Sequence, residues 1–358
     1  MPDADPQPAI ALARSCPKVL LHEHLDGGLR VATLHRLLAE RRLPAPADDV
    51  PGLAQWFREH AFAHSLEQYL KGFDLTVAAM ATEDALAQVA FEAAEDARAD
   101  GAVLAEFRIA PLLFEPHGVP AEAAVAAMLA GLARSPLPSG LILCGMRHQF
   151  DGQVERTAEL AIDFHRRPVA GDAPRVVGFD LAGPEAGFPP SRHAAALARV
   201  REAGLPITLH AGEADAAERI VEAADHGAVR IGHGVHLADV LADPARRGLV
   251  DEVVARGLHL EVCPTSNVHT GAYPSLAAHP IGALWRAGVD LSYHTDNRLM
   301  SMVSLADEAE NLVREAGMSL ADLLRMARGA AAHSFLSPAA RTRARAQIDA
   351  WAAAHTAP

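Results

Sequence analysis

The sequence predicts a single (β/α)8 TIM barrel of the α/β class, with a helical insertion after strand 1 and extra C-terminal helices. The chain has 358 residues, which suits one barrel with insertions. Half of its residues are hydrophobic and 22% are charged, as in globular proteins. Eight short apolar runs alternate with helix-like stretches, and eight strands close such a barrel. We therefore expect residues 1–358 to form one domain.

Each strand is expected from an apolar run that ends in polar residues. Parallel barrel strands are buried on both faces and carry functional side chains at their C-terminal ends. The same alternation would also fit an open doubly wound sheet, and the count of eight favours closure. The runs cover residues 18–24, 102–108, 141–148, 176–183, 206–213, 229–234, 258–266 and 289–296.

Helix-like, alanine-rich stretches separate these runs. One of them follows Thr82, a good N-cap residue, and ends at Gly101, a good C-cap residue. Residues from about 30 to 100 form a long insertion that is typical of several helices. Because this insertion follows the first strand, we expect it to cover the mouth of the barrel as a lid. The segment from Ser319 onward predicts terminal helices.

Composition and charge exclude several classes of partner. The formal net charge is −13 and no cluster of Lys and Arg offsets it, so we expect no nucleic-acid partner. No apolar span predicts a membrane helix, and the first residues lack the apolar core of a secretory signal. Three widely spaced cysteines argue against a disulfide framework. We expect a soluble, cytoplasmic protein that acts on a small molecule, in an oligomeric state that the sequence leaves open.

Metal-ligand residue types recur at the ends of the predicted strands. In "LLHEHLDG", His22 and His24 stand two residues apart, so both would point to one side of an extended strand. With 19 histidines in the chain, such a pair alone is weak evidence. His210, His233 and Asp296 follow the fifth, sixth and eighth strands, whose ends meet at one mouth of a barrel. Imidazoles with a carboxylate and without thiolates indicate a catalytic Zn²⁺ site.

Glu213 in "HAGE" is the candidate proton donor. It stands three residues after His210, where we expect it at the start of the next helix and leaning over the same site. Its alternative role is an ordinary acid in the first helical turn. His233 lies between glycines that would let a ligand approach, although a lone histidine at a strand end is as often a core residue. Cys263 is expected to be a small buried residue.

Seven short motifs together give the sequence its resemblance to the adenosine deaminase family. They are HEHLDGGLR, FDLAGPEAGFPP, HAGE, IGHG, CPTSN, TDNRLMS and AAHSFLS, in this order. The resemblance runs from about residue 17 to 337. It implies a metal-dependent hydrolase barrel with one Zn²⁺ per subunit. It also implies hydrolytic deamination of adenosine or 2′-deoxyadenosine to inosine or 2′-deoxyinosine and ammonia.

By matching positions, the resemblance implies catalytic roles for several motif residues. The implied zinc ligands are His22, His24, His210 and Asp296. Glu213 would protonate the purine ring at N1. His233 and Asp296 would orient the attacking hydroxide.

The resemblance also implies a purine-binding set, with one departure from the family pattern. Asp26 would meet the ribose 5′-hydroxyl, and the backbone of Gly183 would meet the base at N3. Asn297 stands where a second Asp is frequent, and its amide can still donate to purine N7.

Two further departures lie beside this set. Arg298 replaces a common proline, and we favour a salt bridge there over contact with an anionic substrate group. His294 stands where Asn is frequent. The stretch "FRIAPLLF", after the start of the second strand, is more apolar than the family pattern and leaves the pocket shape open.

Other functions stay open at this point. A related deaminase would act on aminofutalosine, adenine or an N6-substituted purine, and Asp26 weighs against adenine because adenine-specific relatives tend to carry Glu there. A metal-dependent hydrolase of a non-purine substrate, or a silent binding protein, would use the same scaffold. Glu213 discriminates between these classes, because an amide or ester has no ring nitrogen to protonate.

Overall fold

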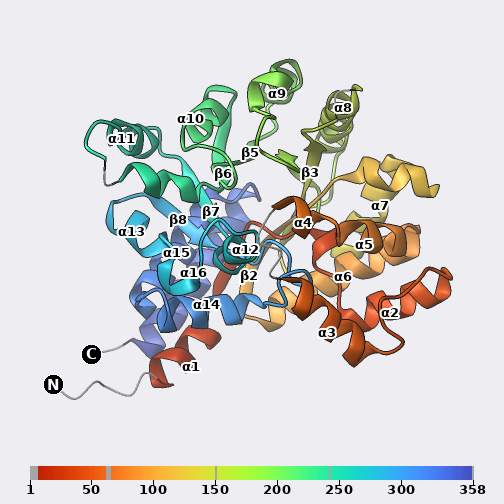
Figure 1. Ribbon diagram of the computed structural model, residues 1–358, viewed down its shortest axis with the longest axis horizontal. Helices are drawn as coiled ribbons and strands as arrows, with labels where there is room; N and C mark the ends of the chain where they lie inside the picture. The colour runs from red at the N-terminus through yellow and green to blue at the C-terminus, as the bar shows by residue number, and fades with distance from the viewer. Residues whose placement is uncertain (1–6, 62–65, 150, 242, 357–358) are drawn as a thin grey trace.

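The structure is a computed structural model that describes residues 7–61, 66–149, 151–241 and 243–356. Its eight strands form one parallel sheet in which each strand pairs with the next along the chain. Helices surround the strands, as Figure 1 shows. The predicted barrel is therefore confirmed. The strands are β1 Lys18–Leu20, β2 Ala102–Ile109, β3 Ser139–Met146, β4 Val176–Ala182, β5 Ile207–Ala211, β6 Ala228–His233, β7 His259–Val262 and β8 Asp290–Tyr293.

The barrel is closed between β8 and β1 by residues just beyond both strands. Glu23 and Asp296 form an isolated parallel bridge. The His24 amide donates to the Asp296 carbonyl at 2.7 Å, and the Asp296 amide donates to the His22 carbonyl at 3.0 Å. The first strand is shorter than predicted, and the two histidines lie in the extended segment that follows it. The seam therefore lies at the C-terminal mouth of the barrel.

The insertion after the first strand is helical, as predicted. Thr82 caps its last helix by accepting a hydrogen bond from the Ala85 amide at 3.2 Å, and Gly101 follows that helix with a φ of 90°. The glycine takes this left-handed conformation without strain, so the chain can turn directly into β2. The helices are α2 Val31–Glu40, α3 Val50–Ala61, α4 Leu66–Leu70, α5 Phe73–Met80 and α6 Glu83–Ala99.

The remaining helices flank the strands or close the chain. The terminal helices predicted from Ser319 onward are present, and Ser319 caps the first of them in a reciprocal capping box with Asp322. The α-helices are α1 Gln7–Ser15, α7 Ala121–Leu132, α8 Gln153–Arg166, α9 Ala194–Glu202, α10 Glu218–Asp225, α11 Gly248–Ala255, α12 Pro264–His269, α13 Ile281–Arg286, α14 Leu305–Arg314, α15 Leu320–His333 and α16 Pro338–His355. The 3₁₀ helices are η1 Leu25–Gly27, η2 Pro111–His117, η3 Pro190–His193, η4 Val235–Val240 and η5 Leu276–Ala278.

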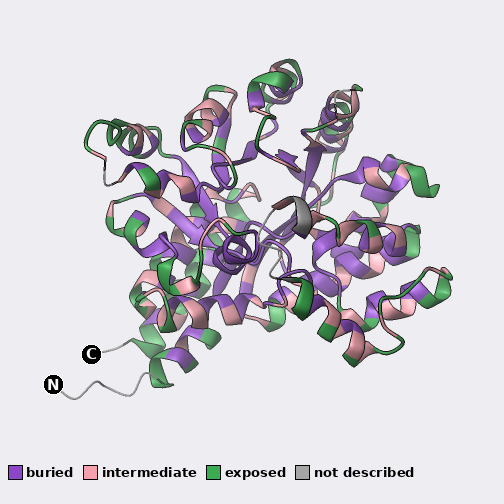
Figure 2. Cartoon of the chain, viewed as in Figure 1, coloured by how far each residue is buried: buried purple, intermediate pink, exposed green. Residues whose placement is uncertain are grey.

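Burial follows the barrel architecture. The strands at the centre are buried, whereas the outer faces of the surrounding helices are exposed, as Figure 2 shows. Apolar side chains from strands and helices make up most of this core. The interior also holds buried charges, among them Arg108 on β2, Asp180 on β4 and Glu261 on β7. No helix among the described residues is long and apolar enough to span a membrane.

Candidate active site and metal centre

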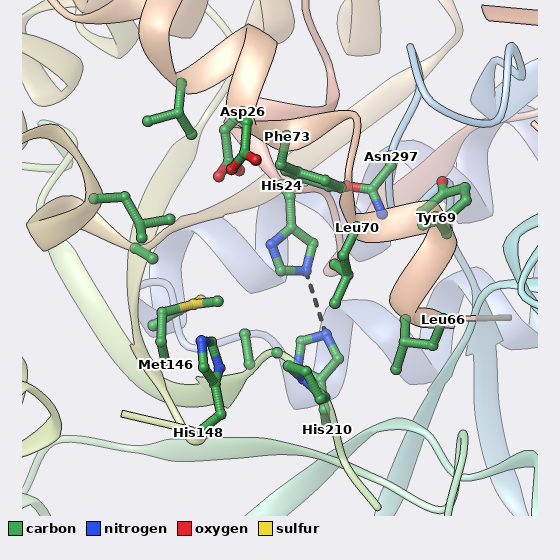
Figure 3. Close-up of a pocket in the computed structure, with 18 of the residues that line it drawn as sticks. His24, Asp26, Leu66, Tyr69, Leu70, Phe73, Met146, His148, His210 and Asn297 are labelled. Carbon is green, nitrogen blue, oxygen red and sulfur yellow. Dashed lines mark hydrogen bonds between the residues drawn. The ribbon is translucent and has the colours of Figure 1, made fainter. Parts of the chain in front are cut away.

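A cavity of about 600 Å³ opens at the C-terminal mouth of the barrel. Apolar side chains form much of its wall, among them Met146 at the end of β3 and Leu113 on η2. Helices α4 and α5 of the insertion cover it with Leu66, Leu70 and Phe73, which Figure 3 shows beside the histidines. The insertion therefore lies over the mouth, as the sequence predicts.

The four predicted ligand side chains meet at the base of this cavity. Asp296 Oδ1 lies 3.3 Å from His22 Nε2 and 3.5 Å from His24 Nε2. The Nε2 atoms of His24 and His210 are 3.2 Å apart, the contact dashed in Figure 3. One nitrogen or oxygen from each of His22, His210, His233 and Asp296 also falls within a common span of 4.8 Å. Side chains from β5, β6 and the segments that follow β1 and β8 thus converge on one point.

The chemistry of this group fits a divalent metal ion. His22 Nε2 is buried and makes no hydrogen bond. Burial lowers the pKa of His210 and lowers the pKa of His24 well below its ordinary value, so both rings are neutral and keep a lone pair for a ligand. Burial alone would raise the pKa of Asp296, but the neighbouring His22 and His233 hold that pKa well below its ordinary value. Three imidazoles and one carboxylate are a zinc-type donor set.

Buried carboxylates orient two of these imidazoles from behind. Glu261 Oε2 lies 2.9 Å from His22 Nδ1, and Asp180 Oδ2 lies 2.9 Å from His210 Nδ1. Arg108 donates to both carboxylates, at 2.5 Å and 2.8 Å. When Nδ1 donates its proton to a carboxylate, Nε2 keeps the lone pair that a metal requires. Each imidazole therefore presents its Nε2 atom to the centre of the cluster.

These supporting carboxylates were not among the predicted site residues. Burial alone would raise the pKa of Glu261, but Arg108 and Arg230 outweigh it and hold that pKa well below its ordinary value. Both carboxylates stand inside runs that the sequence marks as buried strands. The ionisable residue within each run could have pointed to a supporting role, because burying a charge is costly without a partner.

Glu213 lies on the wall of the cavity but not in a helix. The prediction that it begins the following helix is wrong, since α10 starts at Glu218. The chain turns instead because Glu185, itself buried, accepts three consecutive backbone amides. Gly212 donates at 2.6 Å, Glu213 at 2.9 Å and Ala214 at 2.8 Å. Successive amides that point into one concavity form an anion-binding nest, which the Glu185 carboxylate fills.

The surroundings of the Glu213 carboxyl favour its protonated form. Burial raises its pKa well above the ordinary value, and the neighbouring carboxylates Asp296 and Glu185 raise that pKa further. Its Oε2 lies 3.5 Å from His233 Nε2. A protonated carboxylic acid beside a metal-ligand cluster can donate a proton to a substrate.

Asp26 and Asn297 also line the cavity, and each has an unsatisfied oxygen. The Oδ1 atoms of both side chains are buried without a hydrogen-bond partner. Burial raises the pKa of Asp26 to about 7. Asn297 packs directly on Gly27, where an added Cβ would come within 2.0 Å of its Oδ1. A bound ligand with hydrogen-bond donors would satisfy such oxygens.

Gly183 lies at the rim after β4 with a φ of 91°. An added Cβ there would lie 3.0 Å from His148 Nδ1, a side chain that also lines the cavity. The absence of a side chain therefore leaves the backbone of Gly183 open to a ligand.

Two of the residues that depart from the family pattern, Arg298 and His294, support the fold around the site. Arg298 does not line the cavity and lies between three carboxylates, those of Glu23, Asp96 and Asp100, at 3.5–3.7 Å. This agrees with the salt bridge that we favoured. His294 is buried and its Nδ1 accepts the Leu21 amide at 3.1 Å. It therefore joins β8 to the chain after β1.

Comparison with known proteins identifies the family. The family model described as adenosine deaminase matches residues 17–351. An adenosine deaminase of Mycobacterium ulcerans is 39% identical over 346 residues, which are 92% of this chain and 93% of that protein. One from Mycobacterium avium is 41% identical over 344 residues, covering 90% of this chain and 91% of that protein.

Two solved structures share the architecture. An adenine deaminase from Arthrobacter aurescens has a TM-score of 0.84 and 26% identity, covering 95% of this chain and all of its own. An N6-mAMP deaminase from Arabidopsis has a TM-score of 0.80 and 25% identity, covering 95% and 99%. The similar structures thus include deaminases that are named for different 6-aminopurines.

Proposed function

This chain belongs to the adenosine deaminase family, and we propose that it hydrolyses adenosine and 2′-deoxyadenosine to inosine and 2′-deoxyinosine with release of ammonia. The observation that carries the proposal is the buried Glu213 carboxyl, 3.5 Å from His233 Nε2, beside a cluster of metal-ligand side chains. Attack on a purine carbon needs an acid at the ring nitrogen, and hydrolysis of an amide does not. We assign one Zn²⁺ per subunit to His22, His24, His210 and Asp296.

The proposed chemistry divides between the metal and the protein. Bound in this cluster, Zn²⁺ would supply a hydroxide nucleophile near neutral pH. Glu213 donates its proton to purine N1, which draws electrons from C6 and makes that carbon open to attack. Asp296 accepts a proton from the water whose oxygen attacks C6, and His233 donates a hydrogen bond to the same oxygen. Asp296 then passes that proton to the 6-amino group, which leaves as ammonia, and the proton left on the C6 oxygen restores Glu213. The fixed positions of these groups supply the orientation that the reaction needs.

The remaining wall of the cavity suits a purine nucleoside. We assign the Asn297 amide to purine N7, the Gly183 backbone to N3, and Asp26 to the ribose 5′-hydroxyl. Asp26 accepts a hydrogen bond from this hydroxyl best when its carboxyl is ionised. Its pKa of about 7 leaves a large ionised fraction at neutral pH. Apolar residues such as Leu113 and Phe73 would cover the faces of the base.

Charge in the cavity favours nucleosides over nucleotides. The described residues that line it include the carboxylates Asp26 and Asp74 and no Lys or Arg. A 5′-phosphate would meet negative charge without a cation to pair with it. Arg298 follows the cavity residue Asn297 in the sequence and could have paired with a phosphate, but it lies among carboxylates outside the cavity. Aminofutalosine, adenine and N6-substituted purines stay as the alternative substrates.

Comparing substrates tests the proposal. We would measure ammonia release by the zinc-loaded protein from adenosine, 2′-deoxyadenosine, adenine, aminofutalosine, N6-methyladenosine and AMP. We expect the two nucleosides to have the highest kcat/KM, and metal analysis to find one zinc per chain. Turnover of one of the other purines without turnover of adenosine would favour the alternative.

The Glu213→Gln variant tests the reaction class. Gln keeps the size of the side chain but has no proton to give to N1, so kcat should fall by about 100-fold or more. Zinc content should not change, because Glu213 is not an assigned ligand. Full activity in this variant would contradict the purine mechanism and favour a different hydrolase.

We also propose that the protein works in the cytoplasm. Its three cysteines, Cys16, Cys144 and Cys263, are buried and free, and unpaired thiols persist in a reducing compartment.

A further inference from the structure

Two buried side chains connect His233 to a backbone amide outside the cavity. The Ile281 amide, at the start of α13, donates to His279 Nδ1 at 3.3 Å. His279 Nε2 lies 3.2 Å from Asn267 Oδ1, and Asn267 Nδ2 lies 3.0 Å from His233 Nδ1. The side chains of Asn267, His279 and His233 are all buried. Together these four groups form an unbroken chain of hydrogen bonds.

The backbone amide sets the direction of every bond in this chain. Since an amide N–H can only donate, His279 Nδ1 must accept, and a neutral His279 then carries its proton on Nε2. That proton goes to Asn267 Oδ1, which places the amide nitrogen of Asn267 toward His233. The Asn267 N–H in turn donates to His233 Nδ1. A neutral His233 therefore carries its proton on Nε2.

These bond directions leave each ring with a single proton, since an Nδ1 atom that accepts a hydrogen bond carries none. Burial lowers the pKa of His279 to about 3. Protonation of His279 would in addition place an N–H against the Ile281 N–H.

We propose that Asn267 and His279 are positioning residues that lock His233 in the tautomer with its proton on Nε2. In this form Nε2 is a hydrogen-bond donor and has no lone pair for a metal. His233 thus lies within the metal-ligand cluster but acts on the attacking oxygen, while His22, His24, His210 and Asp296 hold the ion. The inference rests on the proposed function, since it assigns the donor that this reaction uses.

Selective ¹⁵N labelling of histidine tests the tautomer directly. Long-range ¹H–¹⁵N correlations of the zinc-loaded protein distinguish protonated from unprotonated ring nitrogens, and a His233→Gln variant identifies the signals of His233. We expect a protonated Nε2 and an unprotonated Nδ1. A protonated Nδ1 with a free Nε2 would overturn the inference, whether or not the protein deaminates adenosine.

An Asn267→Asp variant reverses the last bond at nearly constant size. A carboxylate accepts from both neighbours, so it draws the His233 proton to Nδ1. The ¹⁵N pattern should invert, and kcat should fall by about 100-fold, as expected when a catalytic histidine loses its proton arrangement. KM should change little. A His279→Ala variant frees the Asn267 amide to turn, so it should mix the two tautomers and lower kcat less.

Asn311→Asp is the matched control. Asn311 lies on α14, donates to Thr265 Oγ1 at 3.5 Å and takes no part in the chain to His233. The same change of charge there should leave the ¹⁵N pattern and kcat unchanged. An equal loss of kcat in both Asp variants would show an effect of charge alone and contradict the inference. If adenosine is not turned over but the wild-type pattern is as expected, the proposed function fails and the tautomer stands.

Discussion

His233, the last residue of β6, and Asp296, which follows β8, have positive φ angles of 62° and 60°. Residues other than glycine adopt this left-handed backbone region at a cost of about 1–3 kcal/mol, so their surroundings must hold them there. Ser266 donates to Asp296 Oδ2 at 2.6 Å, and Asn267 holds the His233 ring. Both supporting residues lie on α12. At the residue scale, this strained backbone conformation directs both side chains from the strand ends into the cavity.

A Gly27→Ala variant should weaken nucleoside binding through Asn297. The new Cβ would lie 2.0 Å from Asn297 Oδ1, so the amide must move from its place on the cavity wall. Loss of one hydrogen bond to the base costs about 1 kcal/mol, which predicts a KM for adenosine that is several-fold to tenfold higher. Zinc content should not change, because Gly27 holds no assigned ligand.

The control for this effect is Gly118→Ala, since a Cβ at Gly118 meets no atom within 4 Å. Gly118 also has a φ of 90°, so the variant shows what backbone strain alone does to KM. Equal changes of KM in both variants would contradict the role given to Asn297.

Sequence reasoning found the side chains that meet in the site but not those that orient them. His22, His24, His210 and Asp296 follow strand ends, and strand ends share one mouth, so their meeting was predictable. Their roles as ligands stay predictions. Asn267 was missed as an individual residue because its partners, His233 and His279, are distant in the chain. Only the folded structure shows which histidine nitrogen the amide faces.

At the scale of elements, β4 and β5 are joined mainly by side chains. They share a single registered pair, Phe179 with Ile207, whereas β5 and β6 share five. Beyond that pair, Arg147 donates to the carbonyls of Leu181 and His210 at 2.7 Å and 2.6 Å. Arg147 therefore pairs two carbonyls that this short register leaves without a partner strand amide. Glu185, which follows β4, holds the turn after β5 that carries Glu213.

A Glu185→Gln variant should lower activity by displacing Glu213. An amide oxygen accepts fewer amides than a carboxylate, and the new NH₂ group would face backbone N–H donors. We expect kcat to fall by about tenfold, within the range for misplacing a proton donor. In a Glu213→Gln background, the Glu185→Gln change should lower kcat hardly any further, because no proton donor is left to displace. An equal loss in both backgrounds would contradict this coupling.

Asp322→Asn is the matched control for this pair of variants. Asp322 also accepts three hydrogen bonds, from the Ser319 amide and hydroxyl and from Trp285 Nε1, but it lies at the start of α15 and does not line the cavity. The Asp322→Asn variant should lower thermal stability and leave kcat unchanged.

The elements were predicted better than their ends. Apolar runs located all eight strands, because parallel barrel strands are buried on both faces. The start of α10 was misplaced because the residues after Glu213 have a helical composition. The three amides of residues 212–214 bind Glu185, so the segment cannot also begin a helix. A contact over 27 residues or more of sequence thus decides a local conformation.

At the scale of the whole molecule, the seam of the barrel and the metal site coincide. His22 and His24 lie on the β1 side of the seam, and Asp296 lies on the β8 side. The same residues carry the backbone hydrogen bonds that close the barrel. An ion held by these three side chains would therefore join the two edges. Metal binding and barrel closure should be coupled, because the ion binds the folded state and not the unfolded chain.

Removal of the metal should therefore loosen the seam before the rest of the barrel. Free zinc at 100 times its Kd stabilises the folded state by about 3 kcal/mol, so chelation should lower the Tm by several degrees, and added zinc should restore it. In hydrogen exchange, chelation should speed the exchange of the amides of His24 and Asp296, which bond across the seam. The amide of Gly232 on β6 should change less.

A His22→Ala variant should show neither response to zinc, whereas His165→Gln, on the outer helix α8, should keep both. A Tm that depends on zinc without faster exchange at the seam would show that the ion stabilises the barrel from elsewhere.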